Sequence, residues 1–204
     1  MKAIIKTQNL VFKNFIFYKD IEIPKGQVSF LTGASGVGKS TLFKLINKTA
    51  IQSDGQIFYD DKNIEDYDAT LLRKEIMLIN QDPYLFSETI KGNFDEFYDY
   101  LEKPHISDDE IKKYLMLVSI DFDLTKNCDE LSGGEKHRVF IAIHLSLKPK
   151  VILLDEPTSA LDKNTSLLVI ENVVKFCNKS EITLVVISHD NDIASKFSDK
   201  TISL

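Results

Sequence analysis

The sequence predicts an α/β fold with a mainly parallel sheet, and two observations carry this prediction. Short apolar runs that suit buried strands alternate with stretches of helical periodicity, which is typical of strands joined by crossover helices. In addition, a strand-like run, a glycine-rich loop and an amphipathic helix follow one another over residues 28–47. The length of 204 residues suits a single domain spanning 1–204.

The chain up to residue 32 consists of short apolar runs separated by turn signals, which predicts an N-terminal antiparallel β region. Pro24-Lys25-Gly26 marks the turn into the strand at 28–32. The aromatic residues of this region are expected mostly in the core, by period-2 alternation, although one ring could instead stack on a base. They are Phe12, Phe15, Phe17 and Tyr18.

The loop after this strand is Gly33-Ala34-Ser35-Gly36-Val37-Gly38-Lys39-Ser40-Thr41, which fits the phosphate-loop pattern G-x-x-x-x-G-K-[ST]. Glycines let the backbone wrap around a polyphosphate, and the open N–H groups at the helix start point at the anion. Lys39 adds a positive charge for the β- and γ-phosphates, and Ser40 offers a hydroxyl to Mg²⁺. A chance glycine-rich turn is disfavoured because glycine, lysine and serine all sit in register. The sequence thus predicts a phosphate-loop NTPase core.

The middle of the chain changes from strand-like to helical character at about residue 86. A capping box at 107–110 opens a helix whose apolar face is formed by Ile111, Tyr114, Leu115 and Val118. We therefore expect a helical subdomain of about 86–138, inserted into a core of 1–85 and 139–204. The elements expected before it are strands at 56–59 and 75–80 and a helix at 69–74.

The last third of the chain returns to alternating helices and strands. Leu131-Ser132-Gly133-Gly134-Glu135 opens a helix that Pro149 ends. The elements expected after it are a strand at 151–154, a helix at 164–177, a strand at 182–187, a short helix and a strand at 200–203.

Polar groups follow the predicted strands, and ligands in such sheets bind off the carboxyl ends of strands. Asp155 is expected to hold Mg²⁺ through its water shell, and Glu156 to take a proton from an attacking water. His189 could donate to a γ-phosphate or orient water, and Gln81 could ligate Mg²⁺ or position water. Taken singly, each has an ordinary alternative as a solvated loop residue or a structural histidine. The phosphate loop upstream is what favours a site.

Charge and composition narrow the class of protein. Lys and Arg number 25 against 31 Asp and Glu, a net charge of −6, which argues against nucleic acid as the main partner. Cys128 and Cys177 form neither a zinc-ligand spacing nor a disulfide framework, which suits a reducing cytosol. We see no signal peptide and no run near the roughly 18 apolar residues of a membrane span, so any membrane role is expected through a partner.

Six motifs in family order resemble the ATP-binding cassette (ABC) family over essentially the whole chain. The phosphate loop is similar to the family's Walker A, residues 131–135 to its signature motif, and residues 151–156 to its Walker B. The remaining matches are Gln81 with the Q-loop, Ser159-Ala160-Leu161-Asp162 with the D-loop and His189 with the switch histidine.

The resemblance implies a head-to-tail homodimer with two ATP molecules at its interface. Ser132, Gly133 and Gly134 of one copy would cap the γ-phosphate held by the other copy's loop, and Asp162 would lie at the same interface. A Ser-Gly-Gly at a helix start is physically consistent with a second anion site. The chain departs from the family at His137, where many relatives carry glutamine. It also lacks a clear match to the adenine-stacking tyrosine, for which Phe12 and Phe15 are the candidates.

The resemblance further implies the ATPase subunit of an ABC membrane transporter, cytoplasmic and peripheral on the inner face of the membrane through separate membrane subunits. One alternative is a soluble cassette acting on DNA or ribosomes. Only residues 42–130 separate Walker A from the signature, which leaves no room for a long coiled coil, and there is one cassette. Another alternative is a regulatory module that holds ATP without hydrolysis, against which Glu156 and His189 argue.

The stretch 82–90 is the expected contact with the membrane subunit. It sets Tyr84, Leu85 and Phe86 in a loop that otherwise reads as exposed, and an apolar surface patch usually marks a partner site. The alternative is that these side chains pack under the helical insertion. Residues 85–90 resemble the corresponding segment of exporter cassettes, and the chain is similar to stand-alone ATPase subunits of a small bacterial exporter group linked to iron homeostasis.

Overall fold

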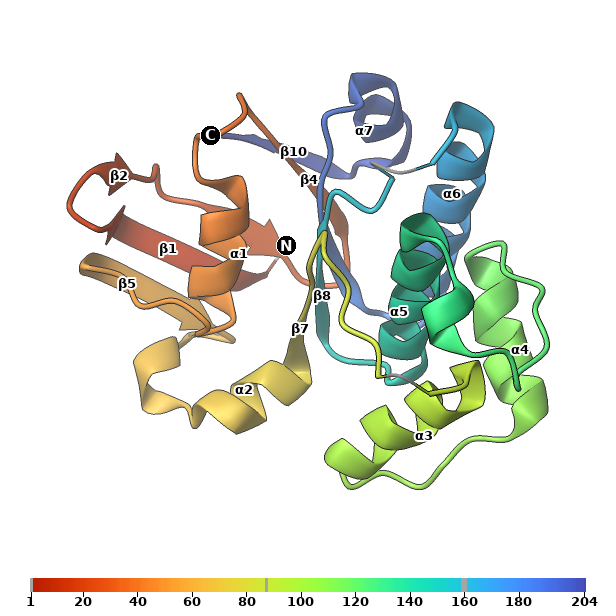
Figure 1. Cartoon of the computed structure of the whole chain (residues 1–204). Coiled ribbons are helices and arrows are strands. Elements are labelled where there is room, and N and C mark those ends of the chain that lie inside the picture. The colour runs from red at the N-terminus through yellow and green to blue at the C-terminus, as the bar shows by residue number, and fades with distance from the viewer. Residues whose placement is uncertain (1, 87, 159–160) are drawn as a thin grey trace.

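The computed structural model describes residues 2–86, 88–158 and 161–204, and it arranges them as two sheets with helices packed around them (Figure 1). One sheet is parallel and has the strand order β10-β4-β9-β8-β7. Its strands are β4 (Val28–Thr32), β7 (Ile76–Ile79), β8 (Val151–Asp155), β9 (Thr183–Ile187) and β10 (Lys200–Ser203). Four of the five are adjacent in the order β4, β9, β8, β7, so the four predicted polar groups follow neighbouring strands.

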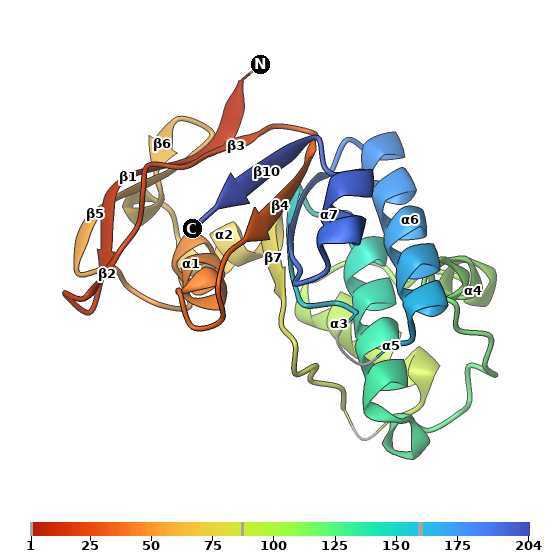
Figure 2. The same cartoon turned by 90° about the horizontal axis from the view of Figure 1, so that it is seen from above.

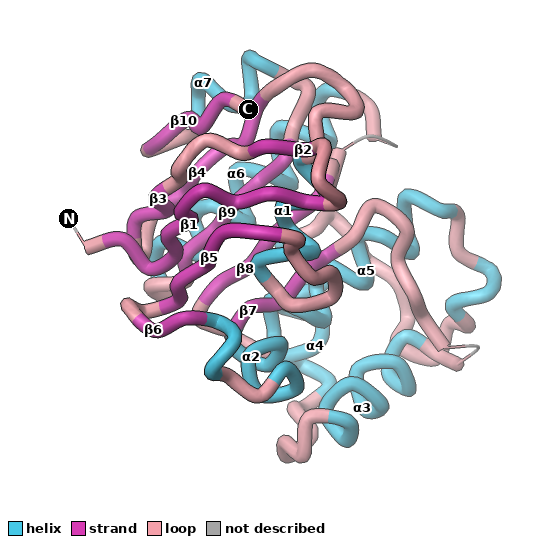
Figure 3. The backbone as a smooth tube through the Cα atoms, turned by 90° about the vertical axis from the view of Figure 1, so that its left-hand side faces the viewer, coloured by secondary structure: helices cyan, strands magenta, loops and turns pink. Residues whose placement is uncertain are grey.

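The second sheet is antiparallel and comes mostly from the first 24 residues and from the segment after the first helix (Figure 3). Its strands are β1 (Ala3–Phe12), β2 (Ile16–Phe17), β3 (Glu22–Pro24), β5 (Asp54–Tyr59) and β6 (Lys62–Asn63). A 3₁₀ turn, η1 (Ile64–Asp66), follows β6. The predicted N-terminal antiparallel region is confirmed.

Helices cover both faces of the parallel sheet (Figure 2). The first two, α1 (Lys39–Ile46) and α2 (Ala69–Glu75), lie on the side of the antiparallel sheet. The opposite face is covered by α3 (Ile90–Tyr100), α4 (Asp108–Leu117), α5 (Gly133–Ser146), α6 (Lys163–Lys179) and α7 (Asn191–Phe197).

Burial on both faces explains the unbroken apolar strands in the sequence. In β8, Ile152 and Leu154 pack into the core under α3–α7, whereas Val151 and Leu153 pack into the core on the α1 side. Every residue of β8 and β9 is buried. A strand with two buried faces needs a continuous apolar run rather than alternation, as is usual for parallel sheets.

The region of the expected helical subdomain contains α3, α4, the 3₁₀ turn η2 (Cys128–Glu130) and the start of α5. The capping box predicted before α4 is present, with Ser107 and Glu110 bonded reciprocally. No clear periodicity predicts α3, whose start Thr89 caps by accepting from the Gly92 N–H. Buried side chains of α3 and α4 share one core with the helix-facing residues of the parallel sheet.

The expectation that most aromatic residues of the first strands are core is wrong. Phe15 is 66% and Phe17 74% exposed, and only Tyr18 of the group is buried. The cause is the tight turn at residues 13–15, where Lys13 and Asn14 adopt positive φ and reset the alternation of sides.

Within the described residues, none of the helices combines the length and the apolar character that a membrane span requires.

Candidate nucleotide-binding site

The phosphate loop joins the end of β4 to the start of α1. Gly36 and Gly38 have φ values of 79° and 103°, in the left-handed region that favours glycine. Helix α1 begins directly after Gly38, which has no side chain with which to cap it. The first N–H groups of a helix have no intrahelical acceptor, so the loop and the start of α1 present donors to an anion.

Lys39 lies across this loop. Its Nζ donates to the carbonyl oxygens of Gly33 and Ala34, both at 2.9 Å, and the residue is 6% exposed. The two bonds hold the ammonium group over the concave side of the loop. A phosphate oxygen that entered there would find a cation already in place, as the motif predicts.

Asp155 ends β8 next to the loop and carries a buried acceptor without a partner. Its Oδ1 has no hydrogen bond within the described residues, while the Ser40 side chain bonds the carboxylate. Burial raises the pKa of Asp155, the Ser40 bond opposes this shift, and the nearby Glu156 charge adds to it. An unpartnered carboxylate oxygen beside a hydroxyl suits a hard divalent cation such as Mg²⁺.

Glu156 follows Asp155 and connects two other predicted residues. Its Oε1 accepts from His189 Nε2 at 2.9 Å, and its Oε2 accepts from Gln81 Nε2 at 3.4 Å. The backbone of Glu156 has φ 47°, and its N–H donates to Ile187 O on the adjacent strand β9. Positive φ in a residue with a Cβ is a strained state that is often found at functional sites.

Of the predicted residues, Lys39, Ser40, Glu156 and His189 border one cavity of about 210 Å³, whereas Asp155 and Gln81 do not line it. Its walls come from the phosphate loop, from Glu156 and His189, and from Ile16 in β2. The structure therefore brings together Lys39, Ser40, Glu156 and His189, as predicted from the order of the strands. The sequence does not predict that Ile16 and the neighbouring Tyr18 lie at this site, because their placement depends on how β2 folds over the loop.

The signature residues lie elsewhere in the chain. Ser132 caps α5 in a full capping box: its N–H and its hydroxyl both donate to Glu135 Oε2 at 2.8 Å, and Glu135 N–H donates back to the Ser132 hydroxyl. Asp162 caps α6 by accepting from the N–H groups of Asn164 and Thr165. Within the described residues, neither motif lines the cavity at the phosphate loop. Ser159 and Ala160 of the expected D-loop lie outside the described residues.

The candidates for stacking on adenine occupy different surroundings. Phe15 is exposed next to Ile16, which borders the cavity, whereas Phe12 packs partly into the core. The Lys13 ammonium lies 5.4 Å from the centre of the Phe12 ring, which occupies one of its faces. Of the two rings, Phe15 is therefore the one that is free to meet a base.

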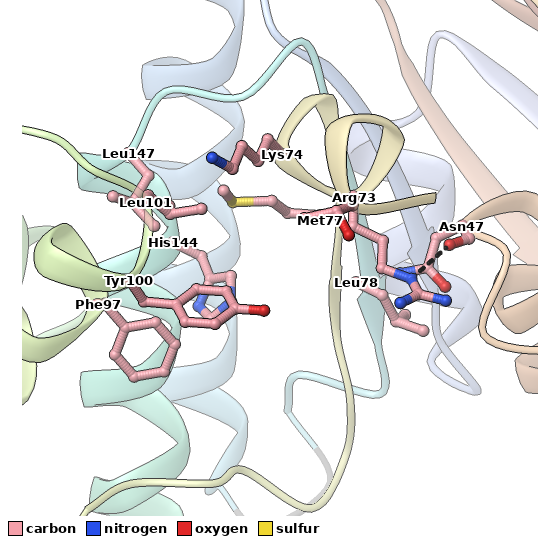
Figure 4. A pocket seen from close by; sticks show the side chains of 11 residues that line it. Asn47, Arg73, Lys74, Met77, Leu78, Phe97, Tyr100, Leu101, His144 and Leu147 are labelled. Atoms are coloured by element: carbon pink, nitrogen blue, oxygen red, sulfur yellow. Dashed lines mark hydrogen bonds between the residues drawn. The ribbon is translucent and has the colours of Figure 1, made fainter. Parts of the chain in front are cut away.

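A second cavity, of about 190 Å³, lies between α2 and β7 on one wall and α3 and α5 on the other (Figure 4). Arg73, Met77 and Leu78 face Phe97, Tyr100 and His144 across it. The stretch after Gln81 reaches the same wall through aromatic rings that meet edge to face. Tyr84 packs on Phe86 at 5.3 Å between centroids, and Phe86 packs on Phe97 at 5.9 Å.

The loop after Gln81 is divided between side chains that pack inward and one that is exposed, and its contact with a membrane subunit stays a prediction. Phe86 packs under α3, its N–H donates to Asn93 Oδ1 at 2.8 Å, and Leu85 packs against the core. Tyr84 is 66% exposed. Ser87 lies outside the described residues.

Comparison with known proteins identifies the protein family of this chain. The family model described as "ABC transporter" matches residues 19–159. The chain belongs to the ABC transporter family. Its ABC ATPase fold and the resemblance predicted from the six motifs are thereby confirmed.

Relatives of this family member include importers and exporters. The chain is 32% identical over 225 residues to the phosphate import ATP-binding protein PstB of Borrelia garinii, covering 98% of this chain and 83% of that protein. It is 32% identical over 182 residues to the probable iron export ATP-binding protein FetA of Escherichia coli, with coverages of 88% and 79%. Among solved structures, cbiO1 of Clostridium perfringens, part of the ABC transporter complex cbiONQ, matches at a TM-score of 0.84 and 30% identity, covering 100% and 85%.

Proposed function

We propose that this chain binds and hydrolyses MgATP and thereby powers an ABC transporter through separate membrane subunits. The observation that carries hydrolysis is the Glu156 carboxylate, which borders the phosphate-loop cavity and bonds both His189 and Gln81. A carboxylate held by two partners beside a phosphate site suits a general base. A module that only held ATP would need none of these three side chains.

Binding of the triphosphate rests on the phosphate loop and on oxygen ligands for Mg²⁺. Lys39 exchanges the carbonyls of Gly33 and Ala34 for phosphate oxygens, while the N–H groups of the loop and α1 donate to the anion. Ser40 and Asp155 would hold Mg²⁺, with Gln81 as a further ligand. When bound, Mg²⁺ supplies charge neutralisation to the phosphates.

Hydrolysis then requires a water in line with the γ-phosphate. Glu156 accepts the proton of this water as it attacks, and Gln81 helps to place it. The His189 Nε2–H, which points at Glu156, can turn to the γ-phosphate and donate there as negative charge builds up. The geometry of the free chain keeps all three within one hydrogen-bonded group.

The second half of the site comes from another copy of the chain in a head-to-tail homodimer. Ser132, Gly133 and Gly134 lie away from the cavity of their own chain, so they are available to cap a γ-phosphate held by a partner. Asp162 lies with the D-loop at the same interface. This arrangement uses both helix starts for two ATP molecules per dimer.

The membrane subunit is proposed to dock at the cavity of Figure 4 and on Tyr84. Exposed apolar side chains lie on the helices of its two walls, with Leu71 of α2 61% and Tyr100 of α3 76% exposed, and Tyr84 in the loop is 66% exposed. Arg73 and Lys74 add positive charge to one wall, so the fitting occupant is an amphipathic helix with an acidic residue. The chain would then be peripheral on the cytoplasmic face of the membrane. A soluble role on DNA is disfavoured by the net charge of −6.

Co-purification with a multi-span membrane protein encoded beside this chain would test the proposal. Wild-type chain should release phosphate from MgATP and should be retained by the tagged membrane subunit. Changing Tyr84 and Phe86 together to Ser should leave basal hydrolysis in place and abolish retention. Normal assembly and transport by this double variant would show that the loop is not the docking surface, and absent phosphate release by wild type would refute hydrolysis.

A further inference from the structure

The Tyr18 hydroxyl is buried against the phosphate loop, although Tyr18 matches no motif of the family. Tyr18 follows β2 and is 7% exposed. Its hydroxyl donates to the carbonyl oxygen of Gly38 at 2.9 Å. The same oxygen accepts from the N–H of Leu42, one helical turn later, at 2.8 Å. The last carbonyl of the loop is thus held by two donors, one from α1 and one from the antiparallel sheet.

The contact is also tight enough to fix the backbone. A Cβ on Gly38 would lie 2.7 Å from the Tyr18 hydroxyl oxygen and 3.2 Å from a methyl of Ile16. The loop therefore rests directly on these two side chains, and Gly38 needs to be glycine for this close approach as well as for its φ of 103°.

The direction of this carbonyl matters for the anion site. In a trans peptide the C=O and the following N–H point in opposite directions. Holding the Gly38 C=O along α1 and against Tyr18 therefore turns the Lys39 N–H in the opposite direction, out of the start of α1. That N–H is among the first of α1 and has no intrahelical acceptor.

We infer that Tyr18 is a positioning residue for phosphate binding: by anchoring the Gly38 carbonyl it sets the Gly38–Lys39 peptide so that the Lys39 N–H faces the phosphates. Burial raises the pKa of Tyr18 to about 12, against a smaller lowering by its bond with Thr41. The hydroxyl accordingly remains a donor at every pH at which the protein works. The inference rests on the proposed ATP binding, because the affected contact is with phosphate.

Tyr18→Phe tests the inference, and Tyr98→Phe is a matched control. Tyr98 is 4% exposed, and its hydroxyl donates to a backbone carbonyl, that of Ser146, at 3.0 Å, far from the phosphate loop. Loss of one such bond should lower the urea midpoint of both variants similarly. Only Tyr18→Phe should raise the dissociation constant for MgATP, by about three- to tenfold. Inorganic tripolyphosphate, used as a competitor, should weaken by the same factor.

The kinetic signature separates positioning from general damage. In Tyr18→Phe the KM for MgATP should rise while kcat at saturation stays within about twofold of wild type, because the contact is made in ground and transition states alike. Unchanged MgATP affinity in Tyr18→Phe, or equal weakening in Tyr98→Phe, would overturn the inference. Failure of wild-type chain to bind MgATP would refute the proposed function instead, so the two failures are distinguishable.

Discussion

The starts of α1 and α5 are both rich in small residues, but the hydrogen bonding at the two helix starts is different. At α1, Gly38 has no side chain, and the donors of the loop are open to a ligand. At α5, Glu135 already accepts from the backbone and the hydroxyl of Ser132. These bonds lower the pKa of the Glu135 carboxyl, which keeps it charged at the place where an anion would approach.

This difference indicates that the two helix starts would have different roles in phosphate binding. The α1 end is formed for phosphate by its own chain, with Lys39 in place and Asp155 beside it. At the α5 end the capping box occupies the Ser132 hydroxyl and the Glu135 N–H, and this end would engage a phosphate only when a second chain brings one close enough to compete with Glu135. Under the proposed function, such a chain would hold ATP alone and hydrolyse it only as a pair.

The largest effect should come from Glu156→Gln, which removes the proposed general base next to the α1 end. Turnover should fall by roughly 10²–10⁴, since that is the usual contribution of a positioned general base. MgATP binding should persist, because the phosphate contacts come from the loop. Phosphate release measured at saturating MgATP checks the prediction, and hydrolysis close to the wild-type rate would refute the role of Glu156.

Lys39→Ala and Ser132→Arg should separate the two helix starts. Lys39→Ala removes a charged donor from the formed site and should weaken MgATP binding to the monomer by about 10- to 100-fold. Ser132→Arg should leave this affinity nearly intact while abolishing hydrolysis, because a bulky cation replaces a small cap. Calorimetric titration of dilute monomer measures the MgATP affinity of both variants. Equal loss of monomer binding in the two variants would place the signature residues in the same chain's site.

Lowering the pH should decrease the stability of the fold through His144, which lies in the last turn of α5. Burial lowers the pKa of His144 to about 4, against a smaller upward effect of its bond to Phe140 O. Below the ordinary pKa of about 6.5 the unfolded chain takes up a proton that the folded chain does not, so stability falls as pH decreases. Between pH 7 and 5.5 this loss should amount to about 1 kcal/mol. Urea unfolding of wild type and His144→Phe at both pH values checks it, and identical pH dependence would contradict a neutral buried histidine.

Much of the fold and of the α1 site could be predicted from sequence because the signals are local. Unbroken apolar runs such as 151–154 identify doubly covered strands, and the rule that ligands lie at strand ends placed Asp155, Glu156 and His189 together. Helix α3 was missed although Ile90, Phe94 and Tyr98 share one buried face, because Gly92 and Asn93 lower its helical propensity.

Other features depend on contacts distant in sequence. The bond between Tyr18 and Gly38 arises only when β2 folds over the loop, and no periodicity encodes it. The capping box of Ser132 and Glu135 is readable as a helix start, but sequence spacing does not say whether the helix start faces its own chain's cavity or another's. That question is geometric and concerns two chains.

Sedimentation equilibrium of the Glu156→Gln variant with MgATP tests most directly whether the α5 end acts on a partner's nucleotide. We predict a dimer carrying two ATP molecules, a monomer without nucleotide, and, for Glu156→Gln combined with Ser132→Arg, a monomer that still binds one ATP. A Glu156→Gln chain that stays monomeric when saturated with MgATP, or a double variant that no longer binds ATP as a monomer, would contradict the division of work between the two helix starts.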